Sequence, residues 1–206
     1  MSTVNVAVIY YSSTGTTHEM AQRLAQAAEK AGAEVRVRHV AELAPREVVD
    51  SQDAWREHLE SVKDQPTAQP DDVVWADVVL LGSPTRFGNV ASQLKQFIDS
   101  LGPQWGQGLL ANKVYAGFTS SQTTHGGQES TLLALYNTIH HFGGLIVSPG
   151  YTDAVKFADG NPYGVGHVTG AENDEPLGST EHDALDHMAE RAVEVARKLK
   201  AGEQAG

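Results

Sequence analysis

Residues 4–17 read VNVAVIYYSSTGTT, an apolar run that passes directly into a loop of hydroxyl side chains around one glycine. An apolar run of this kind is typical of a central parallel strand that is covered by helices on both faces. A helical pattern follows at once, with apolar positions from Met20 to Ala31, and Gly32 marks its end. The stretch therefore predicts a strand, a loop and a helix in immediate succession.

The loop after this strand is suited to holding a phosphate group. It lies where the next helix begins, and the free N–H groups and positive dipole end of a helix N-terminus favour an anion. Gly15 lets the backbone approach a ligand closely, and hydroxyl donors come from Ser12, Thr14, Thr16 and Thr17. The loop contains no lysine or arginine. The sequence thus predicts that this loop binds a phosphate through dipoles and hydroxyls.

Two other kinds of phosphate loop are excluded by the residues. A Walker loop needs a lysine after its second glycine, and a dinucleotide loop needs three spaced glycines. This loop has one glycine and no lysine. An ordinary strand-to-helix connection, in which a serine or threonine caps the helix, stays open as an alternative. We favour phosphate binding because the loop carries more hydroxyls than a cap requires.

Composition narrows the class of protein. The chain has 206 residues, a formal net charge of −11 and no cysteine. The length suits one domain over residues 1–206, and the lack of cysteine excludes disulfides and thiolate chemistry. The negative charge argues against binding to nucleic acid or to an anionic membrane. With no apolar run long enough to cross a membrane and no room for a signal peptide before the first strand, we expect a cytoplasmic protein.

Strand and helix patterns alternate along the rest of the chain. Further strands are predicted at residues 35–40, 77–83, 113–119 and 145–147. Helical patterns lie between them, and a last helix covers the apolar positions from Leu185 to Leu199. This order predicts an α/β fold with a doubly wound, five-stranded parallel sheet and helices on both faces.

Two stretches interrupt the alternation. Residues 44–72 are polar, carry three prolines and contain a weak helical pattern over residues 54–62. Residues from about 148 to 180 are rich in glycine. Each stretch is too short to bury a core of its own. We therefore interpret both as surface excursions of the single domain.

Three of the predicted strands end in polar, glycine-containing sequence. The first ends in the hydroxyl loop, the second continues as SPTRFGN over residues 83–89, and the third as SSQTTHGGQE over residues 120–129. Ligands of open parallel sheets bind beyond the carboxyl ends of the strands, so these segments are expected to meet at one site. Such a site suits a planar, polar-edged ring system that is attached to a phosphate.

These three motifs, with GPQW at residues 102–105 and NPYG at residues 161–164, resemble the WrbA family of flavodoxin-like NAD(P)H:quinone oxidoreductases. The resemblance extends over nearly the whole chain. The first motif is shared by flavodoxins at large, whereas the second and third are more specific. The resemblance implies a flavodoxin-like fold, FMN as bound cofactor, NAD(P)H as reductant, a homotetramer, and two-electron reduction of quinones to hydroquinones.

The resemblance also implies which residues serve the site. The FMN phosphate is expected to lie on Ser12, Thr14, Gly15, Thr16 and Thr17. The flavin ring is expected to contact Pro84, Thr85, Arg86, Phe87 and Gly88 at one edge. At its other polar edge it is expected to contact Ser121, Gln122, Thr123, Thr124, His125 and Gly126.

Further residues are implied beside the ring. His141 is expected near the flavin, where it is the candidate proton donor to the departing hydroquinone. Trp105 is expected to form a wall of the substrate pocket, and Thr14 to contact the substrate as well. Some family members carry a tyrosine linked to nicotinamide binding at the position of Thr14, so this chain departs from them there.

Several of these residues have simpler interpretations. Arg86 suits a surface ion pair as well as a ligand contact. Trp105 suits the filling of a gap under a proline-rich turn. His141 lies near a predicted helix C-terminus, where a charged histidine is favourable for structural reasons. The remaining histidines and carboxylates show no spacing typical of metal ligands, so no metal site is predicted.

The same cofactor fits three kinds of protein. A quinone oxidoreductase would use one place for NAD(P)H and then for the quinone, which predicts ping-pong kinetics. A one-electron carrier, a flavodoxin proper, would share the first loop and the negative charge. A binding or regulatory protein would hold FMN as a structural element. The two excursions favour the oxidoreductase because they provide material for enclosing a substrate pocket.

Overall fold

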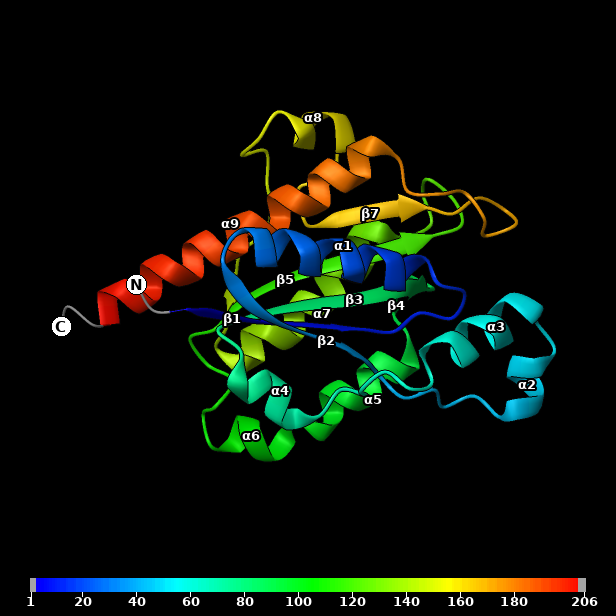
Figure 1. The fold of residues 1–206 in the computed structure, drawn as a ribbon, viewed down its shortest axis with the longest axis horizontal. Helices are drawn as coiled ribbons and strands as arrows, with labels where there is room; N and C mark the ends of the chain where they lie inside the picture. Colours follow the sequence, from blue (N-terminus) through cyan, green and yellow to red (C-terminus); the bar gives the residue numbers. More distant parts are fainter. Residues whose placement is uncertain (1–2, 204–206) are drawn as a thin grey trace.

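A parallel sheet lies at the centre of the computed structural model, which describes residues 3–203 (Figure 1). Its main strands are β1 (Val4–Tyr10), β2 (Ala33–His39), β3 (Val78–Arg86), β5 (Val114–Ser121) and β6 (Leu145–Ile146). They are hydrogen-bonded in the order β2-β1-β3-β5-β6. The central strands β1, β3 and β5 are almost fully buried, as expected for apolar runs, whereas the edge strand β2 is half-buried.

Helices cover both faces of this sheet (Figure 1). The described helices are α1 (Thr16–Lys30), α2 (Arg46–Asp50), α3 (Asp53–Val62), α4 (Pro70–Trp75), α5 (Ser92–Ser100), α6 (Gly102–Gly106), α7 (Gln128–Phe142), α8 (Val155–Asp159) and α9 (Ser179–Glu203). Side chains of β1 alternate between two cores. Val6 and Val8 pack with α1 and α9, while Ala7 and Ile9 pack with α4, α5 and α7. The prediction of a doubly wound sheet with helices on both faces is confirmed.

The fifth strand position is shared by two segments. β6 pairs with the beginning of β5, and β7 (Val165–Val168) pairs with its end, from Phe118 to Ser121. The interpretation of residues 148–180 as a surface loop is therefore wrong for residues 165–168. A strand of four residues that includes a glycine and a histidine is too short to show an alternating pattern.

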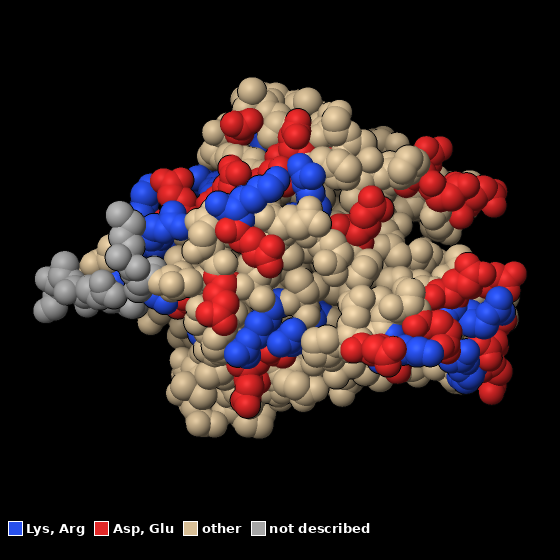
Figure 2. Space-filling view, in the orientation of Figure 1, with Lys and Arg blue, Asp and Glu red and all other residues tan. Residues whose placement is uncertain are grey.

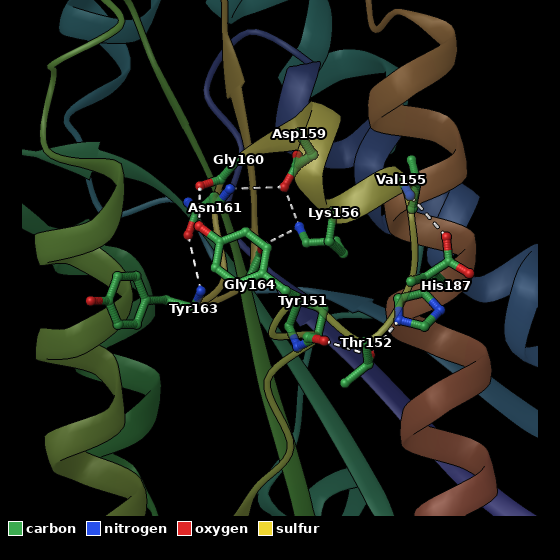
Figure 3. A network of polar contacts seen from close by, with 12 residues as sticks. Tyr151, Thr152, Val155, Lys156, Asp159, Gly160, Asn161, Tyr163, Gly164 and His187 are labelled. Carbon is green, nitrogen blue, oxygen red and sulfur yellow. Dashed lines mark hydrogen bonds and ion pairs between the residues drawn. The ribbon is translucent and has the colours of Figure 1, made fainter.

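The segment between β6 and β7 is fixed by a buried ion pair (Figure 3). Lys156 is fully buried, and its ammonium group bonds the Asp159 carboxylate and donates to the Gly164 carbonyl at 2.9 Å. The Asn161 N–H also donates to Asp159, at 3.2 Å. Burial raises the pKa of Asp159 and lowers the pKa of Lys156, and pairing opposes both shifts. These bonds compensate for the desolvation of two charges inside the protein.

In the first excursion, residues 44–72, the helices α2 and α3 are attached to the sheet by hydrogen bonds to one carboxylate rather than by a buried ion pair. α2 and α3 extend beyond the carboxyl edge of the sheet (Figure 1), and α3 confirms the predicted helical pattern. Glu42 connects them to the sheet: its carboxylate accepts hydrogen bonds from the Tyr11 hydroxyl at 2.7 Å, the Trp55 indole at 2.9 Å and the Gln93 amide at 2.6 Å. Burial opposes ionisation of Glu42, but bonds from Ala44 and these side chains lower its pKa below the ordinary value.

Across residues 3–203, no helix combines the length and the apolar character needed to cross a bilayer.

Candidate functional site

A cavity of about 400 Å³ lies at the carboxyl ends of β1, β3 and β5, where the sequence predicts the site. Its lining is mainly hydroxyl and amide groups. Residues predicted from the sequence make up most of it: Ser12, Thr14, Thr16, Thr17, Pro84, Thr85, Arg86, Ser121, Gln122, Thr123 and Gly126. The structure adds Ser13, Gln52, Ser120, Thr169 and Asn173.

The first loop prepares the start of α1 for an anion. Gly15 has a φ of 109° and precedes the first helical residue, and α1 has no side-chain cap. The Ser12 hydroxyl accepts from the Gly15 N–H at 3.0 Å, and the buried Thr17 hydroxyl lies 3.3 Å from that of Ser120. The alternative of an ordinary capped connection is therefore wrong. The hydroxyls instead line the cavity, and no side chain of the described residues caps the start of α1 by a hydrogen bond.

The second loop is a tight hairpin. β3 turns into β4 (Asn89–Val90), and the two residues of the turn, Phe87 and Gly88, have φ values of 54° and 76°. Positive φ at both positions suits a two-residue hairpin, but it is strained for a bulky residue such as Phe87. The Phe87 side chain is fully exposed at the rim and does not line the cavity. A strained backbone that holds an aromatic ring in solvent is typical of a functional segment.

Arg86 supplies a positive charge that the first loop lacks. Its guanidinium lies 3.4 Å from the Ser13 hydroxyl and donates to the Thr85 carbonyl at 3.1 Å. No carboxylate of the described residues pairs with it, so the alternative of a surface ion pair is not supported. The loops after β1 and β3 together therefore offer what favours an anion at this end of the cavity, helix dipoles from one and a positive charge from the other.

The third loop is folded by its own hydrogen bonds. The Ser121 hydroxyl donates to the Thr123 carbonyl at 2.8 Å, and the Gly126 N–H donates to the same carbonyl at 2.9 Å. Gln128 donates to the Ser121 hydroxyl at 3.0 Å. Thr124 and His125, at the tip of the loop, are exposed and do not line the cavity. The backbone of this loop is thus fixed while its tip faces solvent.

His141 and Trp105 do not reach the cavity within one chain. His141 is in the last turn of α7, which begins at the carboxyl edge of the sheet and ends at the opposite edge (Figure 1). The Trp105 indole donates to the His141 carbonyl at 2.7 Å, so the two residues lie together there. Trp105 is 55% exposed, which contradicts the interpretation that it fills a gap under a turn.

Three of the added lining residues lie outside the motifs of the sequence, whereas Ser13 and Ser120 belong to the first and third loops. Gln52 lies between α2 and α3, and Thr169 and Asn173 follow β7. All three therefore come from stretches interpreted as excursions. Asn173 has a φ of 59°, a conformation that asparagine tolerates. An asparagine in the sequence can indicate a tight turn of this kind, but it does not indicate that the turn lies at the cavity.

The mouth of the cavity is acidic. Figure 2 shows carboxylates on both sides of the notch between the α2–α3 segment and the loop after β7, with Lys and Arg among them on the α2–α3 side. Glu172, Asp174 and Glu175 are exposed on the β7 side, and Asp53 and Glu57 on the α3 side. This rim repels anions from a distance, whereas the dipoles and Arg86 inside attract them.

Known proteins are similar to this chain over most of its length. The family model described as NADPH-dependent FMN reductase matches residues 4–158. An NAD(P)H dehydrogenase (quinone) of Deinococcus radiodurans is 48% identical over 95% of this chain and 97% of that protein. A protein of the same name from Sinorhizobium fredii is 38% identical over 94% of this chain and 98% of that protein.

Solved structures show the same fold. A flavodoxin, WrbA-like protein from Agrobacterium tumefaciens has a TM-score of 0.65 at 24% identity and covers 95% of this chain and 99% of its own. A flavodoxin from the domain Archaea has a TM-score of 0.58 at 15% identity, over 96% of this chain and 99% of its own. The chain therefore belongs to the NADPH-dependent FMN reductase family, and the resemblance of its motifs to WrbA is confirmed.

Proposed function

We propose that this protein is an FMN-dependent NAD(P)H:quinone oxidoreductase. The observation that carries the proposal is the cavity, in which an uncapped helix start meets two further loops of polar donors at the strand ends. These residues fit FMN: Ser12–Thr17 suit its phosphate, and Thr85–Arg86 with Ser121–Gly126 suit the polar edges of its ring. When bound, FMN supplies the chemistry of accepting a hydride and passing on two electrons.

The residues of this chain position the reactants. Arg86 holds a fixed positive charge at the cavity wall. The bonded turn around Ser121 presents backbone donors without rearrangement. Because one cavity serves both reactants, NAD(P)H must leave before a quinone enters, which gives ping-pong kinetics. Intersecting lines in a double-reciprocal plot would contradict this order.

We also propose a homotetramer in the cytoplasm. Large exposed apolar side chains support association of copies: Phe87 is 102% exposed, Phe157 71% and Trp105 55%. His141 and Trp105 lie far from the cavity of their own chain, so they can serve a site only in another copy. The lack of cysteine suits a reducing compartment. Light scattering during size-exclusion chromatography tests the assembly.

A visible absorption spectrum tests the function. The purified protein is expected to show flavin bands, to lose them on addition of NADH, and to regain them on addition of benzoquinone. Direct oxidation of NADH without a partner reductase distinguishes an oxidoreductase from a one-electron carrier. Tight FMN without turnover of benzoquinone would favour a binding protein, and a colourless protein that binds no added FMN would refute the proposal.

A further inference from the structure

Three histidines gather beside the phosphate loop. His18 is on α1, His39 ends β2 and His58 is on α3, and all three are half-buried. The rings of His18 and His58 lie 5.4 Å apart, and Nδ1 of His58 is 3.7 Å from where a Cβ on Gly15 would be. Ser12 separates the cavity from a small hollow lined by His39 and His58. The proposed reaction uses none of these imidazoles.

Hydrogen bonding distinguishes His18 from His58. Nδ1 of His18 lies 2.5 Å from the Tyr10 hydroxyl. Burial raises the pKa of Tyr10 above its ordinary value, so the phenol keeps its proton and Nδ1 of His18 is already engaged in a hydrogen bond with it. The His58 ring makes no hydrogen bond to any residue between 3 and 203, so His58 can accept a proton without losing a partner.

The surroundings of His58 disfavour its protonated form. Burial, with His18 and His39 nearby, lowers the pKa of His58 to about 4. The titratable groups facing this cluster are Tyr10 and Tyr11 from β1, His18 and Glu19 from α1, His39 from β2, and Glu42 after β2. Glu42 already accepts several hydrogen bonds, which reduces its capacity to stabilise a charge on His58.

A bound phosphate would favour the protonated form of His58. A phosphate monoester carries about −1.5 to −2 charges near pH 7, and an opposite charge within a few ångströms favours the protonated form of a histidine. The loop beside His58 offers a phosphate N–H groups and hydroxyls, and Arg86 reaches that loop only at Ser13. Of the described residues that line the cavity, only Arg86 carries a positive charge, and His58, in the hollow beside Ser12, is placed to provide a second one.

We propose that His58 is a proton-linked part of the phosphate site, which takes a proton from solvent when a phosphate dianion binds to the loop at residues 12–17. The inference rests on the proposed binding of FMN. It predicts that acidification tightens the binding of FMN and leaves the binding of riboflavin, which has no phosphate, unaffected.

The test is flavin affinity as a function of pH. Apoprotein is titrated with FMN and with riboflavin between pH 8 and pH 5.5, and quenching of flavin fluorescence gives Kd. Wild type is compared with His58→Asn and with the control His187→Asn, whose imidazole lies on α9 near Thr152. The FMN phosphate itself titrates in this pH range, but it does so equally with every variant, so the difference in Kd between variants reports on the protein. At pH 5.5, wild type and the control are expected to bind FMN about threefold more tightly than His58→Asn does. At pH 8, all three are expected to bind FMN with the same affinity.

A second measurement uses wild type alone. Histidine NMR titrations of apoprotein with and without inorganic phosphate or FMN are expected to show a rise in the pKa of His58. Identical FMN curves for wild type and His58→Asn, an equal gain for riboflavin, or an unmoved His58 titration would overturn the inference alone. A protein that binds neither FMN nor phosphate at any pH would overturn the proposed function and this inference together.

Discussion

The two stretches that interrupt the strand and helix order are held to the sheet in different ways. In the first, α2 and α3 bury one residue each, Val49 and Val62, and the half-buried Glu42 attaches them. The second buries the ion pair of Lys156 and Asp159 and adds β7 to the sheet. From this difference we expect that the groups buried at the attachment point, more than length or composition, decide how firmly an inserted segment is held, which the following predictions test.

The largest effect is expected from Asp159→Asn. The substitution leaves the Lys156 ammonium without its carboxylate in the interior, and we expect a loss of about 3–5 kcal/mol in the free energy of unfolding. Urea denaturation followed by circular dichroism measures it. The double variant Lys156→Met with Asp159→Leu is expected to recover most of the loss, because it removes both charges together.

The matched control is Asp50→Asn in the first stretch. Asp50 forms an exposed ion pair with Arg46, and its loss is expected to leave the urea midpoint unchanged. If Asp159→Asn proved no less stable than Asp50→Asn, burial of the pair would not be what fixes the second stretch.

A smaller effect is expected from Glu42→Gln, which removes the carboxylate that attaches the first stretch. We expect a loss of about 1–3 kcal/mol at pH 7. The pKa of Glu42 is lowered in the folded protein, so its contribution is present above the ordinary value of about 4.5 and is lost as pH falls through the lower folded value. Melting temperatures from pH 7 to pH 3 should therefore fall less steeply for the variant. A slope equal to that of wild type would contradict this role.

Cavity residues from the two stretches should differ in their effect on FMN affinity. Thr169 is buried and donates to the Asn173 side chain at 3.0 Å, whereas Gln52 is exposed. Thr169→Val is expected to weaken FMN binding about fivefold, which corresponds to about 1 kcal/mol. Gln52→Ala is expected to change it by less than about twofold. Fluorescence titration measures both, and the reverse order would show that the exposed stretch controls the cofactor.

The smallest effect concerns the acidic rim that both stretches contribute. Since carboxylates on both sides of the mouth repel the anionic NADH, its KM is expected to fall about twofold as salt rises from about 20 to about 200 mM. The KM of an uncharged quinone should stay constant. The double variant Glu172→Gln with Glu175→Gln removes charge on the β7 side and should reduce the dependence of this KM on salt. The double variant Asp53→Asn with Glu57→Gln should do the same from the α3 side. Equal salt dependence in all variants would exclude the rim as its source.

Most of the fold could be predicted because its signals are local. The apolar runs of β1, β3 and β5 are long enough to identify buried strands, and the residues after them identify the three loops that meet at the cavity. β7 could not be predicted, because four residues with a glycine and a histidine carry no periodicity. Its place in the sheet depends on pairing with β5, which is a tertiary contact.

The candidate site could be predicted where its residues directly follow a strand, because the strands themselves could be predicted. Residues directly after strands follow the sheet to its carboxyl edge, so their meeting can be inferred from topology. Gln52 and Thr169 reach the cavity, and His58 reaches the hollow beside Ser12, only because particular helices and turns pack there. The resemblance predicts His141 near the flavin and Trp105 at the wall of the substrate pocket. Both lie at the opposite edge of the sheet within one chain, so their roles stay predictions that depend on an assembly of copies.

The divided fifth strand position also bears on how the sheet avoids pairing with other chains. β6 has two residues and β7 has four, so neither presents a long row of free backbone groups to an incoming strand. At the other edge, β2 carries Arg36 and Arg38, which both pair with Asp72. Arg36 also lies 4.0 Å above the Trp75 ring. Short strands at one edge and charged side chains at the other are both features that hinder edge-to-edge pairing with another chain.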